Sequence, residues 1–343
     1  YNCFIGFSLL IPHNLIKYKV TYCSKGAILM PGLITNYLFG EQAYQALSSN
    51  YLKEIINKNT NAYRMGLQGP DIFYYYLSPY MRKRKNNICN ILHEKNTGIF
   101  IDNMLEYAGF LETDEKEICL AYISGFLCHY ALDTHTHPYL RYRMQVDLEH
   151  HPELHRDAFC YRRLETLMDS LLLKRMNHME PSQLNLEALV SVNKKERKNI
   201  SDCLLYALRT TYHYRLSRKT LLKVIRSVRR TCIFLQTNPQ MRQRLIYFFK
   251  KRLRMHMSSS KACFIYPEYQ GDPKDYLNEN NHIWFASDNN IPRTESFFDL
   301  LSDANLFGTQ MLEALDDYLA WHGSRENLID TIGSRSYYTG ETC

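Results

Sequence analysis

The stretch that decides the fold reads Gly125-Phe-Leu-Cys-His129-Tyr-Ala-Leu-Asp133-Thr-His135-Thr-His137-Pro138. Three potential metal ligands, His129, Asp133 and His137, recur in it at every fourth residue. On an α-helix each step of four residues turns about 40° past a full circle and rises about 6 Å, so the three side chains climb one face in a shallow spiral. One metal could take two of them, and a cluster of metals could share all three with Asp133 as the bridge. Pro138 predicts that the helix stops or kinks there.

The residues that precede His129 are largely apolar, which predicts that the helix is buried. His and Asp at a spacing of four commonly form a surface hydrogen bond and nothing more. Here Ile118–Leu132 contains mostly Ala, Ile, Phe and Leu. A buried carboxylate is costly unless it is paired or bound to a metal. We therefore favour a metal site over a surface hydrogen bond.

Other candidate ligands stand on both sides of this segment. Glu165 and Asp169 repeat the four-residue spacing on a second expected helix. Upstream, Asp71 follows a Gly–Pro pair, and His93 follows two apolar residues. Taken alone, each has an ordinary alternative: a solvated carboxylate for Glu165, a helix cap for Asp71 and a satisfied core histidine for His93.

Helical periodicity runs through most of the chain, and convincing alternating strands are absent. The expected helices are Tyr37–Leu47, Ile99–Phe110, Glu115–Leu132, Phe159–Met176, Ile200–Tyr214, Lys219–Leu235, Gln240–Met257 and Thr294–Trp321, the last with Thr294 as its cap. We predict an all-α fold.

With these residues in view, the chain resembles the zinc-dependent phospholipase C family, which is related to the single-strand-specific zinc nucleases. The segments that carry the resemblance are Met30–Pro31, Leu38–Glu41, Gly69–Asp71, His93, His129–Pro138, Leu164–Asp169, Trp284, Glu295–Phe297 and Ser336–Gly340. The resemblance implies an all-helical domain over residues 30–341, with a cluster of three zinc ions in a central cleft. The zinc ions of the family polarise a phosphodiester and activate a water molecule.

The resemblance also implies which residues hold each metal. A first set of ligands is complete: Asp71, His93, His129 and Asp133. A second set keeps His137 and Glu165 but has Tyr161 where the family has His. A third set shares Asp133, uses the backbone amino terminus as a ligand and has Asn36 where the family has His. Translation from Met30 and removal of that Met would expose Pro31 as this terminus. We expect one to three zinc ions, with fewer than three bound, and we expect Asp71 and Asp133 to be the catalytic residues.

Residues 1–29 lack helical periodicity, so we expect an N-terminal extension. Translation from Met30 is one interpretation, and an ordinary extension is the other. The ten cysteines include no Cys-x-x-Cys pair, and no apolar run reaches the roughly 18 to 20 residues that span a bilayer. The stretch Phe4–Pro12 is a poor signal peptide. These features predict a reduced, cytoplasmic protein without a transmembrane segment.

Three functions remain in competition. The leading hypothesis is a phospholipase C-type phosphodiesterase that acts on phospholipid headgroups or similar phosphate esters, with reduced activity and peripheral membrane contact as open points. The second is a non-catalytic zinc-binding or interaction protein, which Asn36 and Tyr161 favour. The third is a nuclease-like phosphodiesterase. We do not expect a nucleic-acid partner, because the basic residues of 216–256 fit a solvated helical face and no base-stacking motif is evident. The net charge of +7 suits anionic partners in general.

Overall fold

The structure is a computed structural model and describes residues 32–48, 50–76, 88–150, 160–236, 273–286 and 291–343. Its N-terminal helices are α1 (Leu33–Ala46), α2 (Asn50–Lys58), α3 (Thr60–Gly66), the 3-10 helix η1 (Gly69–Phe73), α5 (Ile88–Glu94) and α6 (Thr97–Gly109). The middle of the chain forms α7 (Thr113–His150), α8 (Cys160–Asn177), the 3-10 helix η3 (Pro181–Gln183), α9 (Leu186–Leu189), α10 (Lys194–Tyr212) and α11 (Arg218–Gln236). The C-terminal part forms α13 (Pro273–Leu277), α14 (Phe297–Leu319) and α15 (Arg325–Ile332). The predicted all-α fold is confirmed.

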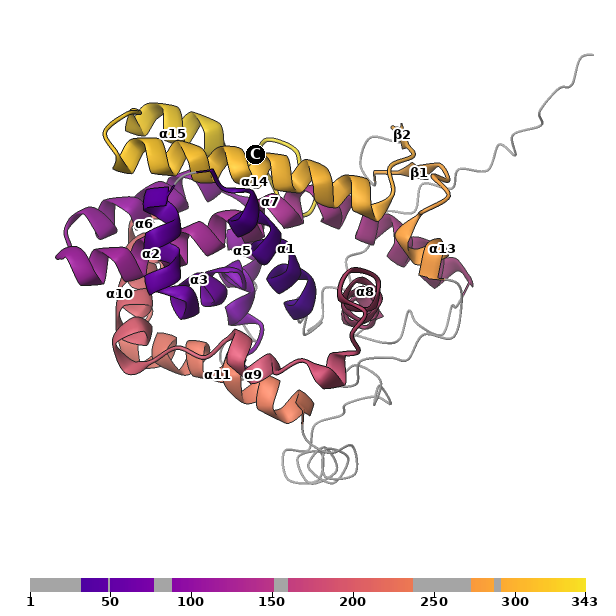
Figure 1. The fold of residues 1–343 in the computed structure, drawn as a ribbon, viewed down its shortest axis with the longest axis horizontal. Coiled ribbons are helices and arrows are strands. Elements are labelled where there is room, and N and C mark those ends of the chain that lie inside the picture. Colours follow the sequence, from indigo (N-terminus) through magenta and orange to yellow (C-terminus); the bar gives the residue numbers. More distant parts are fainter. Residues whose placement is uncertain (1–31, 49, 77–87, 151–159, 237–272, 287–290) are drawn as a thin grey trace, which may run out of the picture.

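Helix α7 is the axis around which the other helices pack (Figure 1). It contacts α3 and α14 most extensively, and α6, α1, α2 and α10 cover further parts of its surface. Residues 118–134 of α7 are all buried, as the apolar sequence before His129 predicts. Helix α3 comes so close that a Cβ atom on Gly66 would lie 2.1 Å from the carbonyl oxygen of Tyr122, and one on Gly125 would lie 2.1 Å from that of Tyr63. The two glycines therefore permit a backbone contact that holds η1 beside the middle of α7.

Of the two outcomes expected at Pro138, a stop or a kink, the stop is wrong, because α7 continues to His150. A proline inside a helix removes one backbone hydrogen bond and costs about 3 kcal/mol. The continuation buries Tyr139, Leu140 and Met144 and packs against the strand β1 (Trp284–Phe285). Burying side chains of this size contributes about 1.5–3 kcal/mol each, which outweighs the cost of the proline.

The start of α14 also differs from the expectation. Its cap is Ser296, not Thr294. The Ser296 hydroxyl accepts a hydrogen bond from the backbone N–H of Asp299, whose carboxylate accepts one from the backbone N–H of Ser296. This reciprocal pair requires an acidic or amide residue three positions after the cap. Thr294 has Phe297 at that position and cannot form it.

The other expected helices agree with the structure at their centres, apart from Gln240–Met257, which lies outside the described residues. So do residues 1–29 and the Met30–Pro31 junction. Two short strands, β1 and β2 (Pro292–Arg293), pair antiparallel where no strand was expected. None of the described helices is long and apolar enough to cross a membrane.

Candidate metal centre

Four side chains from three separate elements meet beside the middle of α7. Asp71 comes from η1, His93 from α5, and His129 and Asp133 from α7 itself. One ligand atom from each lies within 4.8 Å of the other three, and all four residues are buried. The structure therefore brings together the four residues of the first set.

The spacing of these atoms suits a tetrahedral metal. His93 Nε2 lies 3.1 Å from Asp71 Oδ1 and 3.8 Å from Asp133 Oδ2. His129 Nε2 lies 3.6 Å from Asp71 Oδ2 and 3.1 Å from Asp133 Oδ2. A tetrahedral zinc ion with bonds of about 2.0–2.2 Å keeps its donor atoms about 3.3–3.6 Å apart. These four distances scatter around that range, and the four ligand atoms all lie within 4.8 Å of one another.

The turn that carries Asp71 is built around Gly69. Its φ of +47° lies in the left-handed region, and a Cβ atom there would lie 2.1 Å from Cδ2 of His129. Gly69 and Pro70 open the short helix η1, in which Asp71 is the acidic residue of the first turn. The Gly–Pro–Asp sequence thus places a carboxylate directly against the His129 ring.

Backbone carbonyl groups orient both imidazoles of the first set. His93 Nδ1 lies 2.7 Å from the carbonyl oxygen of Cys89, and His129 Nδ1 lies 3.1 Å from that of Leu67. A carbonyl oxygen only accepts, so Nδ1 is the donor and, in the neutral ring, Nε2 carries the lone pair. Metal-binding histidines are commonly held in this way.

The groups in the middle of the cluster require a cation between them. In the neutral tautomer, Nε2 of each imidazole is an acceptor that faces carboxylate oxygens. His129 Nε2 and Asp133 Oδ2 are fully buried, and neither has a hydrogen-bond partner among the described residues. Buried polar atoms that lack partners are costly, and a bound ion can satisfy them. Two imidazole nitrogens and two carboxylates are also donors that zinc accepts. The four residues therefore fit a zinc ion.

Without a metal, protons would take the place of that cation. Burial would lower the pKa of His129, but the Asp133 and Asp71 carboxylates outweigh burial and raise it. Burial would likewise lower the pKa of His93, yet its neighbours, Asp71 among them, raise it well above its usual value. Burial would raise the pKa of Asp133, but the imidazoles of His129 and His137 hold it well below its usual range. The site favours positive charge at its centre.

A comparison with known families agrees with this geometry. A family profile described as "Zinc dependent phospholipase C" matches residues 37–221, more than half of the chain. The chain belongs to this family. No curated protein and no solved structure matches it.

Within the zinc-dependent phospholipase C family, the second and third ligand sets are the ones in which this chain departs from the pattern. His137 Nε2 lies 3.3 Å from Asp133 Oδ2, the oxygen that also faces His129. Glu165 is buried on α8, and Asn36 is buried on α1. The Nδ2 atom of Asn36 has no hydrogen-bond partner in the described part of the chain. Tyr161 falls in α8, but its side chain lies outside what the structure describes. That His137 and Glu165 bind a metal stays a prediction.

Asp169 has a role that its sequence spacing did not reveal. Its carboxylate is fully buried and accepts hydrogen bonds from the backbone N–H groups of Ile34 and Thr35 and from the Thr35 hydroxyl. An acidic group at a helix N-terminus satisfies amides that have no partner within the helix and interacts favourably with the helix dipole. Asp169 thereby joins α8 to the start of α1, the helix that carries Asn36.

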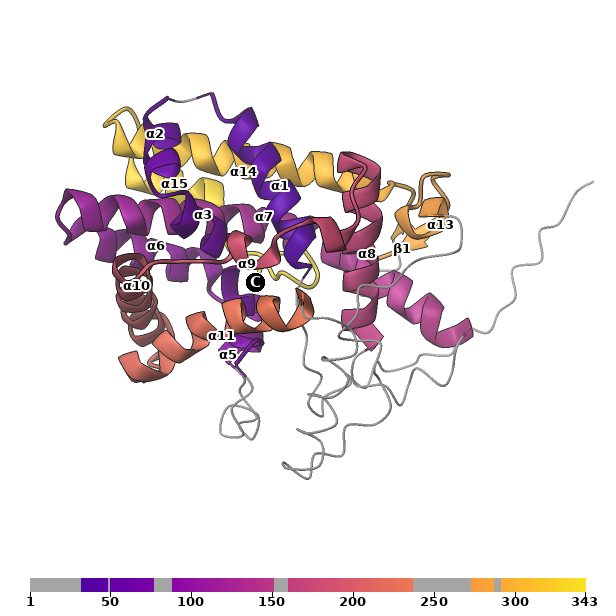
Figure 2. The same ribbon diagram turned by 60° about the horizontal axis from the view of Figure 1, so that its bottom comes forward.

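Two tyrosines near the C-terminus of the chain cover the first set. The Tyr338 ring stacks on His93 with the ring centroids 5.3 Å apart and the planes 19° from parallel. The Tyr337 ring lies 4.8 Å from that of His93, and its backbone N–H donates to the His93 carbonyl oxygen. In the sequence, the Ser336–Gly340 segment carries a resemblance to the family but no signal of this role. The C-terminal end lies beside α14 in Figure 1 and near the middle of the view in Figure 2.

Proposed function

We propose that this protein is a zinc-dependent phosphodiesterase that hydrolyses phospholipid headgroups or similar phosphate esters. One observation carries the proposal: Asp71, His93, His129 and Asp133 place four donor atoms within 4.8 Å of one another in a buried site. Membership of a zinc-dependent phospholipase C family supports the reaction class.

The first set would hold the metal, and we assign the catalytic part to Asp71 and Asp133. When bound, zinc supplies Lewis acidity, which polarises a phosphoryl oxygen and lowers the pKa of water. Asp133 Oδ2 faces the Nε2 atoms of His129, His137 and His93 at 3.1, 3.3 and 3.8 Å. A carboxylate shared in this way keeps the three rings pointed at one region.

Access to the site should be easiest at its His137 end. His93 and His129 are each 1% exposed, whereas His137 is 9% exposed. We therefore propose that the phosphate ester approaches from the His137 side of α7. The Tyr337 and Tyr338 rings lie nearest to His93, and the Tyr338 ring also lies 6.1 Å from that of His137.

The test is zinc content measured beside hydrolysis of p-nitrophenyl phosphocholine and of phosphatidylcholine vesicles. We expect the unaltered chain to retain zinc through gel filtration and His129→Gln to lose both zinc and turnover. His135→Gln is the matched control on the same helix. Its ring bonds to the Ala131 carbonyl and packs against Phe307, away from the cluster. Zinc-free unaltered protein, or equal losses in both variants, would refute the proposal.

A zinc-binding protein without turnover is the second candidate. The buried Asn36, which stands where the family has His, favours it. In the same experiment it predicts bound zinc with no hydrolysis of either ester. The two candidates therefore separate on one sample.

We further propose that the chain works in a reducing compartment, the cytoplasm in the first place. The free cysteines among the described residues include Cys119, Cys128, Cys203, Cys232 and Cys343. All of these except Cys343 are buried in the helical core. Thiol titration of native protein under denaturing conditions tests this, and two or more disulfides would contradict it.

A further inference from the structure

A basic pocket of about 580 Å³ lies between α10, α11 and the connection that precedes α10. Asn61 from α3 and Asn193, the cap of α10, contribute to its lining. The volume falls within the range of about 300–1,000 Å³ that is usual for small-molecule sites. None of the residues of the metal centre lines it.

Four arginines converge on this pocket. Arg226, Arg229 and Arg230 follow one another at helical spacing on α11, and Arg197 reaches in from α10. The apolar side of α11 is buried, so its basic side is held toward solvent. Figure 2 shows α10 and α11 lying next to one another at the edge of the helical body. The arginines are therefore placed by packed helices.

Little negative charge offsets these guanidinium groups. Arg229 pairs with Glu187. In the described part of the chain no carboxylate pairs with Arg197, Arg226 or Arg230, and no acidic residue lines the pocket. Among the described residues, the Arg197 guanidinium donates only to the Val192 carbonyl oxygen, at 3.4 Å. Partial burial and the nearby Arg226 and Arg229 lower the pKa of Arg197. The like charges are close enough to repel, and a bound anion would relieve them.

We propose that this pocket binds a ligand that carries two or more phosphate groups. The planar guanidinium fork matches phosphate oxygens in pairs, which makes arginine the usual residue for phosphate recognition. After Glu187 offsets one charge, three remain, more than a single phosphate monoester neutralises at pH 7. The lining contains no aromatic side chain on which a base could stack, which argues against single-stranded nucleic acid. The same chemistry belongs to a soluble inositol phosphate and to a phosphorylated lipid headgroup.

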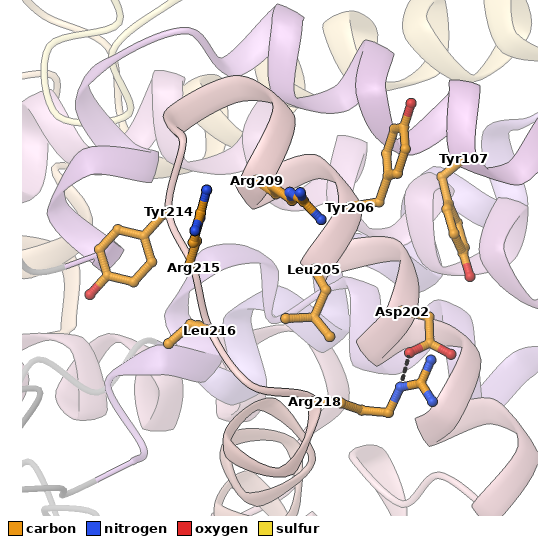
Figure 3. A pocket seen from close by; sticks show the side chains of 9 residues that line it. All are labelled: Tyr107, Asp202, Leu205, Tyr206, Arg209, Tyr214, Arg215, Leu216 and Arg218. Atoms are coloured by element: carbon orange, nitrogen blue, oxygen red, sulfur yellow. Dashed lines mark ion pairs between the residues drawn. The ribbon is translucent and has the colours of Figure 1, made fainter.

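A second pocket on the same pair of helices shows what a less specific basic site looks like (Figure 3). Its lining includes Arg209 and Arg215, with Tyr206 on the side of Arg209 and Tyr214 next to Arg215. Arg218 is neutralised by an ion pair with Asp202, drawn as a dashed line in Figure 3. Arg209 and Arg215 have no carboxylate partner among the described residues. Two such arginines make a weaker anion site than three, and they provide a matched control.

Binding of inositol 1,4,5-trisphosphate to the zinc-loaded chain, measured by calorimetry, tests the proposal. We expect Arg226→Gln with Arg230→Gln to weaken binding by at least about tenfold, because charged hydrogen bonds are lost. Arg209→Gln with Arg215→Gln removes the same charge elsewhere and should change the affinity less than about twofold. These exposed positions tolerate substitution without loss of the core.

Flotation with phosphatidylcholine vesicles, with and without phosphatidylinositol 4,5-bisphosphate, identifies the source of the phosphates. Binding to the soluble headgroup at an affinity equal to that for vesicles supports a free ligand, and much tighter binding to the vesicles supports a lipid. If the two double variants weakened binding equally, the proposed site would be wrong. It would also be wrong if the unaltered chain bound neither the soluble headgroup nor the vesicles. Loss of binding in His129→Gln but not in Arg226→Gln with Arg230→Gln would place the phosphate at the metal centre and also overturn it. None of these outcomes depends on hydrolysis. The proposal of a phosphate-binding pocket can therefore be refuted without refuting the proposed phosphodiesterase activity.

Discussion

The two ends of the ligand ladder on α7 differ in how completely they are equipped. At the His129–Asp133 end, the first set is whole, and each of its imidazoles donates to a backbone carbonyl group. At the His137 end, the expected partners are Glu165 on α8 and Asn36 on α1, and the resemblance to the family implies histidines where this chain has Tyr161 and Asn36. Ligands at every fourth residue of one helix therefore supply only half of each metal site. Neighbouring elements decide whether that half is completed.

Replacing Asp133, the residue that both ends share, should have the strongest effect on metal binding. Asp133→Ala should abolish zinc binding and lower the free energy of unfolding by about 3–5 kcal/mol, because it leaves buried imidazoles without their carboxylate. Metal analysis and thermal unfolding measure the two effects. His135→Ala should retain zinc, since that ring faces Phe307. Equal effects from the two variants would mean that the ligand face has been misplaced.

Replacing Gly69, in the turn before Asp71, tests how much the backbone there supports zinc binding by the first set. Gly69→Ala should cost about 1–3 kcal/mol for the left-handed backbone alone, and the clash with His129 should further weaken zinc binding. Gly109→Ala, at the end of α6, is the matched control, because a Cβ atom there meets nothing within 4 Å. We expect that variant to be neutral or slightly stabilised. Full zinc retention by Gly69→Ala, measured by competition with a chelator, would contradict the role given to this turn.

The second and third ligand sets, each of which lacks a histidine, predict how many zinc ions the chain binds. We expect fewer than three zinc ions per chain and weak phosphocholine-ester hydrolysis, because a missing ligand costs at least the roughly 10 to 100-fold that supporting contacts cost. Asn36→His with Tyr161→His should raise the zinc content, whereas Asn36→Ala with Tyr161→Phe should not. Three tightly bound ions and brisk hydrolysis in the unaltered chain would show that the second and third sets need no histidine here.

The smallest expected effect concerns pH. The raised folded-state pKa values of His93 and His129 stabilise the metal-free chain below their unfolded value of about 6.5, and this stability is lost as pH rises through the folded values. The lowered pKa of Asp133 adds stability above about 3.9, so it does not change in this window. Zinc requires neutral imidazoles. The difference in melting temperature between zinc-loaded and metal-free protein should therefore grow from pH 6 to pH 8.5. A flat difference would contradict the proton competition.

The sequence was most informative where the determinants are local. Apolar residues at helical spacing predicted α6, α8 and α11 within two residues of their bounds, whereas the start of α10 lies six residues before the expected one. The four-residue ladder placed His129 and Asp133 on one face, and the structure has them 3.1 Å apart. Such features depend on neighbours within one or two turns, which the sequence displays directly.

Tertiary packing accounts for what could not be predicted. Helix α7 passes through Pro138 because the burial of Tyr139 and Leu140 outweighs a lost hydrogen bond. The convergence of Asp71 and His93 on α7 was implied only by the resemblance to a family, since each alone looks ordinary. Asp169 gave no signal of its role either, because the α1 amides that it accepts from are 134 and 135 residues away.

The position of Tyr337 and Tyr338 over the first set affects the order in which the site assembles during folding. The hydroxyl groups of Tyr74 and Tyr338 lie 3.3 Å apart although 264 residues separate them, whereas His129 and the Leu67 carbonyl that orients it are 62 residues apart. The entropy lost on closing a loop grows with the length of the loop, so contacts between nearby segments tend to form earlier. The ligands of the first set can therefore gather before Tyr337 and Tyr338 arrive. A metal ion would then reach its ligands while the cavity is still open, and the aromatic rings would slow its exchange with solvent.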